Sequence, residues 1–94
     1  MRIDRFLFFI RLVKSRTLAQ AIIQEGYVRV DGKRIEKPSE EVHLGGTIAL
    51  SLHGKVRVLR VIRLPDRRGP ASEARLCYEE LGPIRTIDGE GSAS

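Results

Sequence analysis

Hydrophobic residues at the start of the chain recur every three or four positions, which is the spacing of one helix face. The predicted apolar face consists of Ile3, Phe6, Leu7, Ile10 and Val13. Phe9 widens this face, and Phe8 with Leu12 forms a narrower strip that we expect to contact another element. Asp4 falls in the first turn, where a carboxylate suits the positive end of the helix dipole. The pattern therefore predicts a first helix across residues 3–13.

A second helix is predicted to begin after Ser15, whose hydroxyl can accept a hydrogen bond from the first turn. Its apolar side consists of Leu18, Ala19, Ile22 and Ile23. On the other side Arg16, Gln20 and Gln24 follow one another at intervals of four residues. Gly26 can adopt the left-handed conformation that ends a helix. The polar side suits contact with phosphates and base edges, although its spacing also fits a helix face that only meets solvent.

A hairpin is predicted directly after the second helix. Residues 27–30 alternate as a strand, and Asp31-Gly32 is a strong indication of a two-residue turn. The turn places Lys33 and Arg34 on a projecting corner at the start of the return strand. Pro38 then disfavours helix at the preceding residue, so residues 37–39 are predicted to form a loop.

Two longer stretches of alternating residues follow, and each is predicted to form a strand. The first covers residues 48–52 and the second covers residues 56–64. Within the second stretch the apolar positions change phase between Val58 and Leu59. This change indicates a β-bulge or a strand that is buried on both faces.

A short amphipathic helix with an acidic surface is predicted near the C-terminus. Its apolar positions are Ala74, Cys77, Tyr78 and Leu81. Its acidic positions are Glu73, Glu79 and Glu80. Gly82-Pro83 would end this helix, a basic linker at 65–70 precedes it, and residues 88–94 are expected to be disordered because they are small and polar.

These elements predict a small single domain of the α+β class. Two N-terminal helices would pack on a short, twisted, mainly antiparallel sheet, and a short helix would follow near the C-terminus. With 94 residues, the chain supports one modest core. We divide it into a folded part at 1–64 and a C-terminal part at 65–94 that holds the linker, the acidic helix and the tail.

Charge is distributed unevenly around a net value of +5. Residues 1–35 carry eight basic and three acidic groups, and residues 36–68 carry seven and four. Residues 69–94 carry two basic and five acidic groups. A basic body with an acidic end suggests a polyanionic partner, and nucleic acid is the usual one. Charge alone leaves open a basic surface that serves only solubility.

Other features of the chain bear on its location. The longest apolar run, residues 6–10, is too short to cross a membrane, so we expect no membrane partner. Residues 1–10 carry three charged groups and no small-residue cleavage site, so a signal peptide is not expected. The single cysteine cannot form an internal disulfide, which fits a reducing cytoplasm.

The chain offers no convincing catalytic or metal-binding pattern. His43 and His53 have no Cys or acidic neighbours at metal-ligand spacing, and Cys77 has the environment of a small hydrophobic residue. Gly45-Gly46 lacks the residues that would make it a phosphate-binding loop. We therefore expect a non-enzymatic protein without cofactor or metal.

Motifs at fixed spacing make the first half similar to the S4 RNA-binding domain. They are Arg2-Ile3-Asp4, Ser15-Arg16, Ala19, Ile23, Gly26-x-Val28-x-Val30-Asp31-Gly32 and Lys37-Pro38-Ser39-x-x-Val42. The resemblance covers roughly residues 2–52. This chain has Asp31-Gly32 where Asn-Gly is common in the family, and Gly45-Gly46 where Gly-Asp is common. Both replacements keep the turns.

The second half resembles the ribosome-associated heat-shock protein fifteen family. The match continues through Arg67-Arg68-Gly-Pro-Ala-Ser-Glu-Ala-x-x-x-Tyr78-Glu-Glu, after the two strands. The resemblance implies a cytoplasmic monomer that binds ribosomal RNA or tRNA on the large ribosomal subunit, including subunits obstructed by a nascent chain on tRNA. A related group acts in ribosome-associated quality control, and the sequence does not separate the two duties.

The resemblance also implies that the helix pair and the hairpin corner form the RNA-binding face. The matching residues are Arg2, Arg11, Lys14, Ser15, Arg16, Gln20, Lys33 and Arg34. Arg5 is added because of its charge and its position off the apolar face. A rigid basic surface of this kind would recognise structured RNA by shape, because A-form RNA presents phosphates and 2′-hydroxyls more readily than base edges.

A second hypothesis belongs to a different class of protein. In it the acidic C-terminal helix recruits a protein partner, and the basic body serves only as a tether. A third hypothesis, a fragment of an RNA-modifying enzyme such as a pseudouridine synthase, would require a catalytic Asp in a separate domain, which this chain does not contain.

Overall fold

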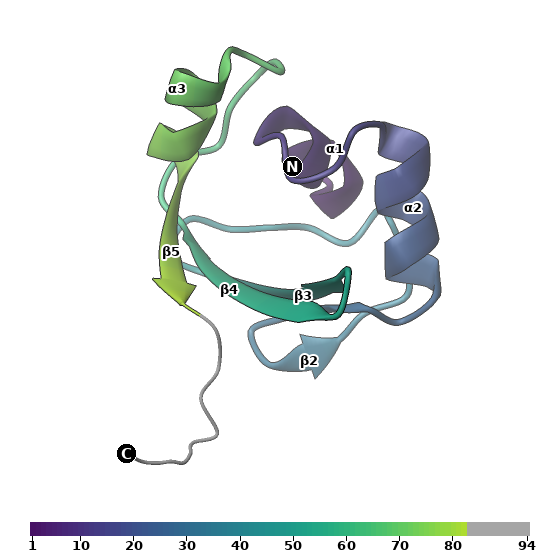
Figure 1. Cartoon of the computed structure of the whole chain (residues 1–94). Helices are drawn as coiled ribbons and strands as arrows, with labels where there is room; N and C mark the ends of the chain where they lie inside the picture. Colours follow the sequence, from purple (N-terminus) through teal and green to yellow (C-terminus); the bar gives the residue numbers. More distant parts are fainter. Residues whose placement is uncertain (83–94) are drawn as a thin grey trace.

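The computed structural model describes residues 1–82, and the predicted disorder of residues 88–94 lies outside this part (Figure 1). The helical elements are α1 (Ile3–Phe9), α2 (Arg16–Gln24), α3 (Ala71–Ala74) and the 3-10 helix η1 (Arg75–Cys77). The strands are β1 (Val28–Val30), β2 (Lys33–Arg34), β3 (Thr47–Leu52), β4 (Lys55–Val61) and β5 (Tyr78–Gly82). No helix of this described part is long and apolar enough to cross a bilayer.

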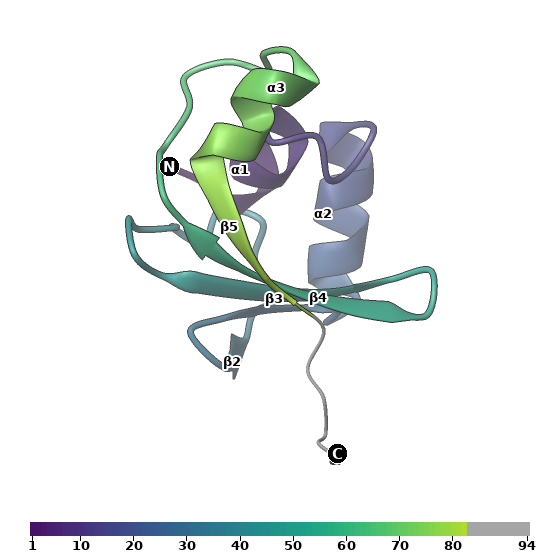
Figure 2. The same ribbon diagram turned by 60° about the vertical axis from the view of Figure 1, so that its left-hand side comes forward.

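Within residues 1–82 the strands form one five-stranded sheet in the order β2-β1-β3-β4-β5, with antiparallel neighbours throughout. Figures 1 and 2 show α1 and α2 on one side of this sheet, with α3 on the same side, above the start of β5. The predicted α+β architecture is confirmed, with two helices on an antiparallel sheet and a short C-terminal helix.

Two local predictions are confirmed by the geometry of α2 and the hairpin. The Ser15 hydroxyl accepts a hydrogen bond from the Leu18 N–H at 3.0 Å and caps α2. In the hairpin turn both Asp31 (φ 51°) and Gly32 (φ 82°) adopt positive φ, as a type I′ turn requires. The turn therefore directs β2 back along β1 at the predicted corner.

Helix α1 ends at Phe9, earlier than its predicted end at Val13. Arg11 adopts a left-handed conformation with φ 65°, which is a position usually taken by glycine. The Arg11 N–H donates to the Phe8 carbonyl and the Leu12 N–H donates to the Leu7 carbonyl, both at 3.1 Å. This pair of hydrogen bonds is a Schellman motif that satisfies the last carbonyls of the helix.

The hydrophobic core lies between the helices and the sheet. Its large buried side chains include Ile3, Phe6, Leu7, Ile10, Ile23, Val28, Ile48, Leu50, Leu59 and Val61. Ala74 and Cys77 belong to the same core, so the segment around α3 helps to close it. Leu18, predicted on the apolar side of α2, is 41% exposed, whereas Ala19, Ile22 and Ile23 are buried.

The predicted helix across Ala74–Leu81 is wrong after Cys77. Residues 78–82 form β5, which pairs with β4. The register shifts between Val58 and Leu59, where the sequence indicated a bulge or a doubly buried strand, and Leu81 of β5 is the extra residue. Pairing with the β4 edge gives the backbone N–H and C=O groups of β5 hydrogen-bond partners. In addition, the Arg57 guanidinium donates a hydrogen bond to Glu80 at 2.6 Å. Glu79 lies opposite Arg60 in the register. The acidic helix of the protein-recruiting hypothesis is therefore partly a strand whose carboxylates face arginines.

Candidate nucleic-acid interface

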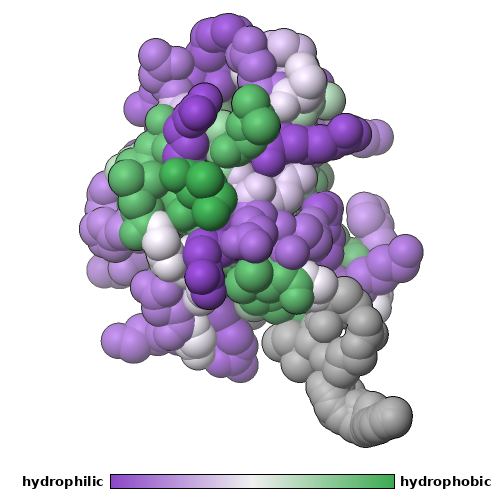
Figure 3. Space-filling model, turned by 90° about the vertical axis from the view of Figure 1, so that its left-hand side faces the viewer, coloured by the Kyte–Doolittle hydropathy of each residue, from purple (hydrophilic) through white to green (hydrophobic). Residues whose placement is uncertain are grey.

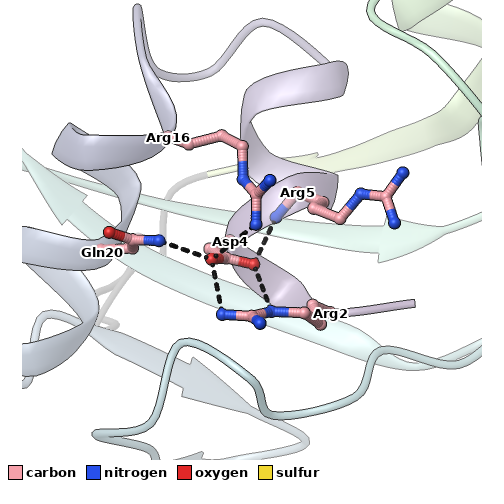
Figure 4. Close-up of polar contacts among 5 residues, drawn as sticks. All are labelled: Arg2, Asp4, Arg5, Arg16 and Gln20. Carbon is pink, nitrogen blue, oxygen red and sulfur yellow. Dashed lines mark hydrogen bonds and ion pairs between the residues drawn. The ribbon is translucent and has the colours of Figure 1, made fainter.

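Asp4 lies in the first turn of α1 and is completely buried, with 0% of its surface exposed. The Arg2 guanidinium donates two hydrogen bonds to its carboxylate, at 3.0 and 3.1 Å. Arg16 donates at 3.3 Å and the Gln20 amide donates at 3.0 Å. Figure 4 shows these three side chains converging on the carboxylate. We call Asp4, Arg2, Arg16 and Gln20 the Asp4 cluster.

The packing of α1 against α2 assembles the Asp4 cluster. Arg2 precedes α1 and Asp4 lies in its first turn, whereas Arg16 and Gln20 lie one turn apart on α2. The side chains of Arg2 and Arg16 remain 44% and 42% exposed. A guanidinium has five N–H donors, so each arginine keeps donors for solvent or a ligand after bonding to Asp4. One buried carboxylate thus holds two half-exposed cations side by side.

The Asp4 carboxylate is held in its charged form. Burial alone would raise the pKa of Asp4, but hydrogen bonds from Gln20, Arg2 and Arg16, and from the backbone N–H of Arg5, outweigh burial. The pKa therefore lies below its ordinary value. With one carboxylate between two guanidiniums, the Asp4 cluster keeps a net positive charge at neutral pH.

Other predicted residues of the first helix turn elsewhere. The Arg5 side chain points away from Asp4 (Figure 4), and its guanidinium lies 5.3 Å from the centre of the Phe9 ring. The Arg11 side chain donates to the carbonyl of Gly69 at 2.7 Å, which ties it to the linker. Arg11 is therefore not brought into the Asp4 cluster, because the left-handed turn after α1 redirects it.

Lys14 and Ser15 lie at the beginning of α2, next to the Asp4 cluster in sequence, and both are exposed. The Ser15 hydroxyl already accepts the cap hydrogen bond from Leu18. The Lys14 ammonium is exposed at the end of α2 that carries Arg16.

The hairpin corner lies near the other end of α2. Lys33 and Arg34 are exposed on β2, and the Arg34 guanidinium is 3.6 Å from Glu36. The same guanidinium lies so close to Gly26 that a side chain at Gly26 would collide with it. Because Gly26 follows α2, which is nine residues or about 13 Å long, this helix connects Arg34 to the Asp4 cluster.

Two features of this region were not predicted from the sequence. One is the role of Asp4, whose partners are 12 and 16 residues away on another helix. The other is Arg68, whose guanidinium lies 4.6 Å from the centre of the Phe8 ring and donates to the Phe8 carbonyl at 3.0 Å. The basic linker thus packs on the end of α1. The apolar strip of Phe8 and Leu12 was the signal in the sequence that another element would pack on this side of α1.

The amino-acid sequence is similar to those of known proteins. A family model described as S4 domain matches residues 1–48. Heat shock protein 15 of Escherichia coli (strain K12) is 40% identical over 80 residues, which are 85% of this chain and 59% of that protein. Small ribosomal subunit protein uS4 of Lacticaseibacillus casei (strain BL23) is 43% identical over 49 residues, which are 52% of this chain and 24% of that protein.

A solved structure extends the match beyond residue 48. Heat shock protein 15 of Vibrio cholerae, described as trimeric, superimposes with a TM-score of 0.81 at 32% identity. This match covers 85% of the present chain and 80% of that one. The structural similarity therefore extends beyond the 48 residues that the family model matches. Against the Escherichia coli relative, the chain spans 59% of the length.

Proposed function

This chain belongs to the S4 domain family and to the heat shock protein 15 group within it, and on that premise we propose that it binds structured RNA on the ribosome without catalysing a reaction. The observation that carries the proposal is the Asp4 cluster, in which a buried carboxylate fixes two half-exposed guanidiniums. Fixed arginines are suited to phosphate oxygens, because the planar guanidinium can donate two parallel hydrogen bonds to one phosphate.

In this mechanism α2 presents a row of donors to the RNA backbone. Arg16, Gln20 and Gln24 follow one another along the helix, with Lys14 before them and Arg34 beyond its end. Because Asp4 already orders Arg2 and Arg16, RNA binding does not have to immobilise those side chains from a freely rotating state. The fixed spacing of the cations would select the shape of an RNA backbone rather than a base sequence.

We further propose that the RNA is ribosomal RNA or tRNA on the large ribosomal subunit, including subunits that carry a nascent chain. The support is the resemblance of residues 67–80 to the heat shock protein 15 group. We propose one copy of the chain as the binding unit, because a single chain supplies every member of the Asp4 cluster.

Binding to the large subunit is expected to weaken steeply with salt, because cations that contact phosphates release counterions. If about four phosphates are neutralised, log K should fall with log salt at a slope of roughly −3 on the single-strand figure. Co-sedimentation of the purified protein with large and small subunits at several salt concentrations measures both the slope and the preference. A slope near zero, or binding to the small subunit alone, would contradict the proposal.

A further inference from the structure

A pocket lies between the end of α1 and the segment that runs from Arg63 to Cys77. It has a volume of about 390 Å³, which is within the range of about 300–1,000 Å³ for small-ligand sites. Phe9, Pro65 and Leu76 form apolar walls, together with Cys77, whose pKa is raised by burial so that the thiol stays uncharged. Figure 3 shows the face around α3 and β5, where hydrophobic patches lie among charged side chains. We call this site the Phe9 pocket.

The wall of the Phe9 pocket is fixed to α1 by hydrogen bonds. The Gly69 carbonyl accepts from Arg11 at 2.7 Å, and Arg68 donates to the Phe8 carbonyl at 3.0 Å. A Cβ added at Gly69 would lie 2.6 Å from a carboxylate oxygen of Glu73, so the linker approaches α3 closely. The pocket is therefore formed before any ligand arrives.

Arginines surround the aromatic wall of the Phe9 pocket. Arg5 lies 5.3 Å from the centre of the Phe9 ring, and Arg63 and Arg67 line the pocket. An aromatic ring among guanidiniums is the composition of sites that stack a nucleobase, because both groups offer flat faces. The Phe9 ring and the three arginines near it point to a base as the ligand.

Two carboxylates determine which part of a nucleotide can enter. Asp66 and Glu73 also line the pocket, and Glu73 accepts a hydrogen bond from Arg67 at 3.1 Å. Carboxylates inside the pocket would repel a phosphate, whereas they can accept hydrogen bonds from the N–H groups of a base edge. The base would therefore lie inside and its phosphates outside, near Arg5.

Arg5 connects the Asp4 cluster to the Phe9 pocket, because its backbone contacts Asp4 and its side chain contacts Phe9. The backbone N–H of Arg5 donates to Asp4 at 2.8 Å, while its side chain lies over Phe9. Asp4 and Phe9 are five residues or about 7.5 Å apart along α1. The matched S4 region ends at residue 48, so the walls from Arg63 onward lie outside it.

We propose that the Phe9 pocket takes one unpaired nucleobase of the RNA whose backbone lies on the Asp4 cluster. The inference rests on the proposed function and adds a preference for RNA in which one base is free to leave the helix. A fully paired duplex could occupy the Asp4 cluster but would leave the Phe9 pocket empty.

The test compares an RNA hairpin that carries a single bulged 2-aminopurine with the same hairpin fully paired. We expect the bulged RNA to bind about fivefold more tightly or better, because stacking on an aromatic residue contributes at least this much. Its 2-aminopurine fluorescence should change on binding. In Phe9→Leu, which keeps an apolar side chain but removes the ring, the ratio of the two affinities should fall to about one.

Further variants show whether a lost preference in Phe9→Leu comes from the pocket or from a folding defect. Arg63→Gln removes an exposed cation that lines the pocket, and it should also reduce the preference for the bulged RNA. Arg75→Gln makes the same charge change on η1 outside the pocket, and Leu44→Ala truncates a side chain that is 63% exposed elsewhere. Both controls should keep the preference.

The outcomes separate this inference from the proposed function. If the protein binds the paired hairpin with the expected salt dependence but shows no preference for the bulge, the inference is overturned and the proposed function stands. A preference that survives in both Phe9→Leu and Arg63→Gln also overturns it. If neither hairpin binds and ribosomal subunits do not either, both proposals fail.

Discussion

Asp4→Asn is expected to weaken RNA binding about tenfold, although it removes a negative charge from a surface that binds a polyanion. The carboxylate accepts from Arg2 at 3.0 and 3.1 Å and from Arg16 at 3.3 Å. An amide offers one acceptor oxygen, and its NH₂ group would face the guanidinium donors. Both arginines would then adopt many orientations that RNA binding must restrict.

Net charge alone predicts that Asp4→Asn binds RNA more tightly than the wild type. One added positive charge about 7 Å from a phosphate is worth about 0.6 kcal/mol in water, or about threefold tighter binding. Weaker binding by Asp4→Asn would therefore mean that Asp4 acts by positioning the arginines, whereas tighter binding would mean that only net charge matters. Fluorescence anisotropy of a labelled, fully paired RNA hairpin at one fixed salt concentration measures it.

Asp31→Asn is the matched control for charge. It adds the same charge in the basic hairpin and keeps the side-chain oxygen that accepts the Thr47 N–H at 2.9 Å. Binding should be unchanged or slightly tighter. If Asp4→Asn binds RNA as tightly as the wild type, the positioning role of Asp4 is wrong.

Stability measurements show whether Asp4→Asn still folds. We expect the free energy of unfolding to fall by roughly 2 kcal/mol, because charge-assisted hydrogen bonds to a buried group are lost while the half-exposed arginines regain water. The folded pKa of Asp4 is lowered, so its stabilisation is present above the unfolded pKa of about 3.9 and is lost as pH falls through the folded value. The stability difference between wild type and variant should therefore shrink in acid.

Arg16→Ala is expected to weaken RNA binding about tenfold and to reduce the magnitude of the salt slope by about 0.7, because one phosphate contact disappears. The fold should persist, since Arg16 is half exposed and Asp4 keeps its bonds from Arg2 and Gln20. Arg16→Lys should keep the slope but lose affinity, because an ammonium cannot reproduce the planar guanidinium between Asp4 and a phosphate.

The control for Arg16→Ala is Arg60→Ala, which removes an exposed arginine from β4 opposite Glu79. Its effect on affinity and on the salt slope should be much smaller. Equal losses in both variants would mean that binding depends on overall charge rather than on the α2 face. A lost cooperative melting transition in Arg16→Ala would make that residue structural.

Local sequence signals predicted much of the fold. The Ser15 cap and the Asp31-Gly32 turn each depend on a few neighbouring residues, so the chain alone reveals them. The predicted bounds of the C-terminal helix were wrong, because contacts with a distant strand determine the structure there. Residues 78–81 have helical spacing, but pairing with the β4 edge makes them a strand.

The candidate site was predictable in its residue types but not in its arrangement. Family spacing identified Arg2, Arg16 and Gln20, whereas their common partner Asp4 emerges only when α1 packs on α2. Arg11 shows the opposite case. Nothing in its neighbourhood indicates a left-handed residue, and that conformation carries its side chain to the Gly69 carbonyl.

The most direct test of the RNA-binding face is a nitrogen-15 NMR titration of the protein with the paired RNA hairpin. The largest shifts are expected at the side-chain Nε–H signals of Arg2 and Arg16 and along the backbone of α2, with smaller shifts at the corner of Lys33 and Arg34. Largest shifts around the β3–β4 turn at His53 and Gly54, with the Arg2 and Arg16 signals unmoved, would contradict this expectation.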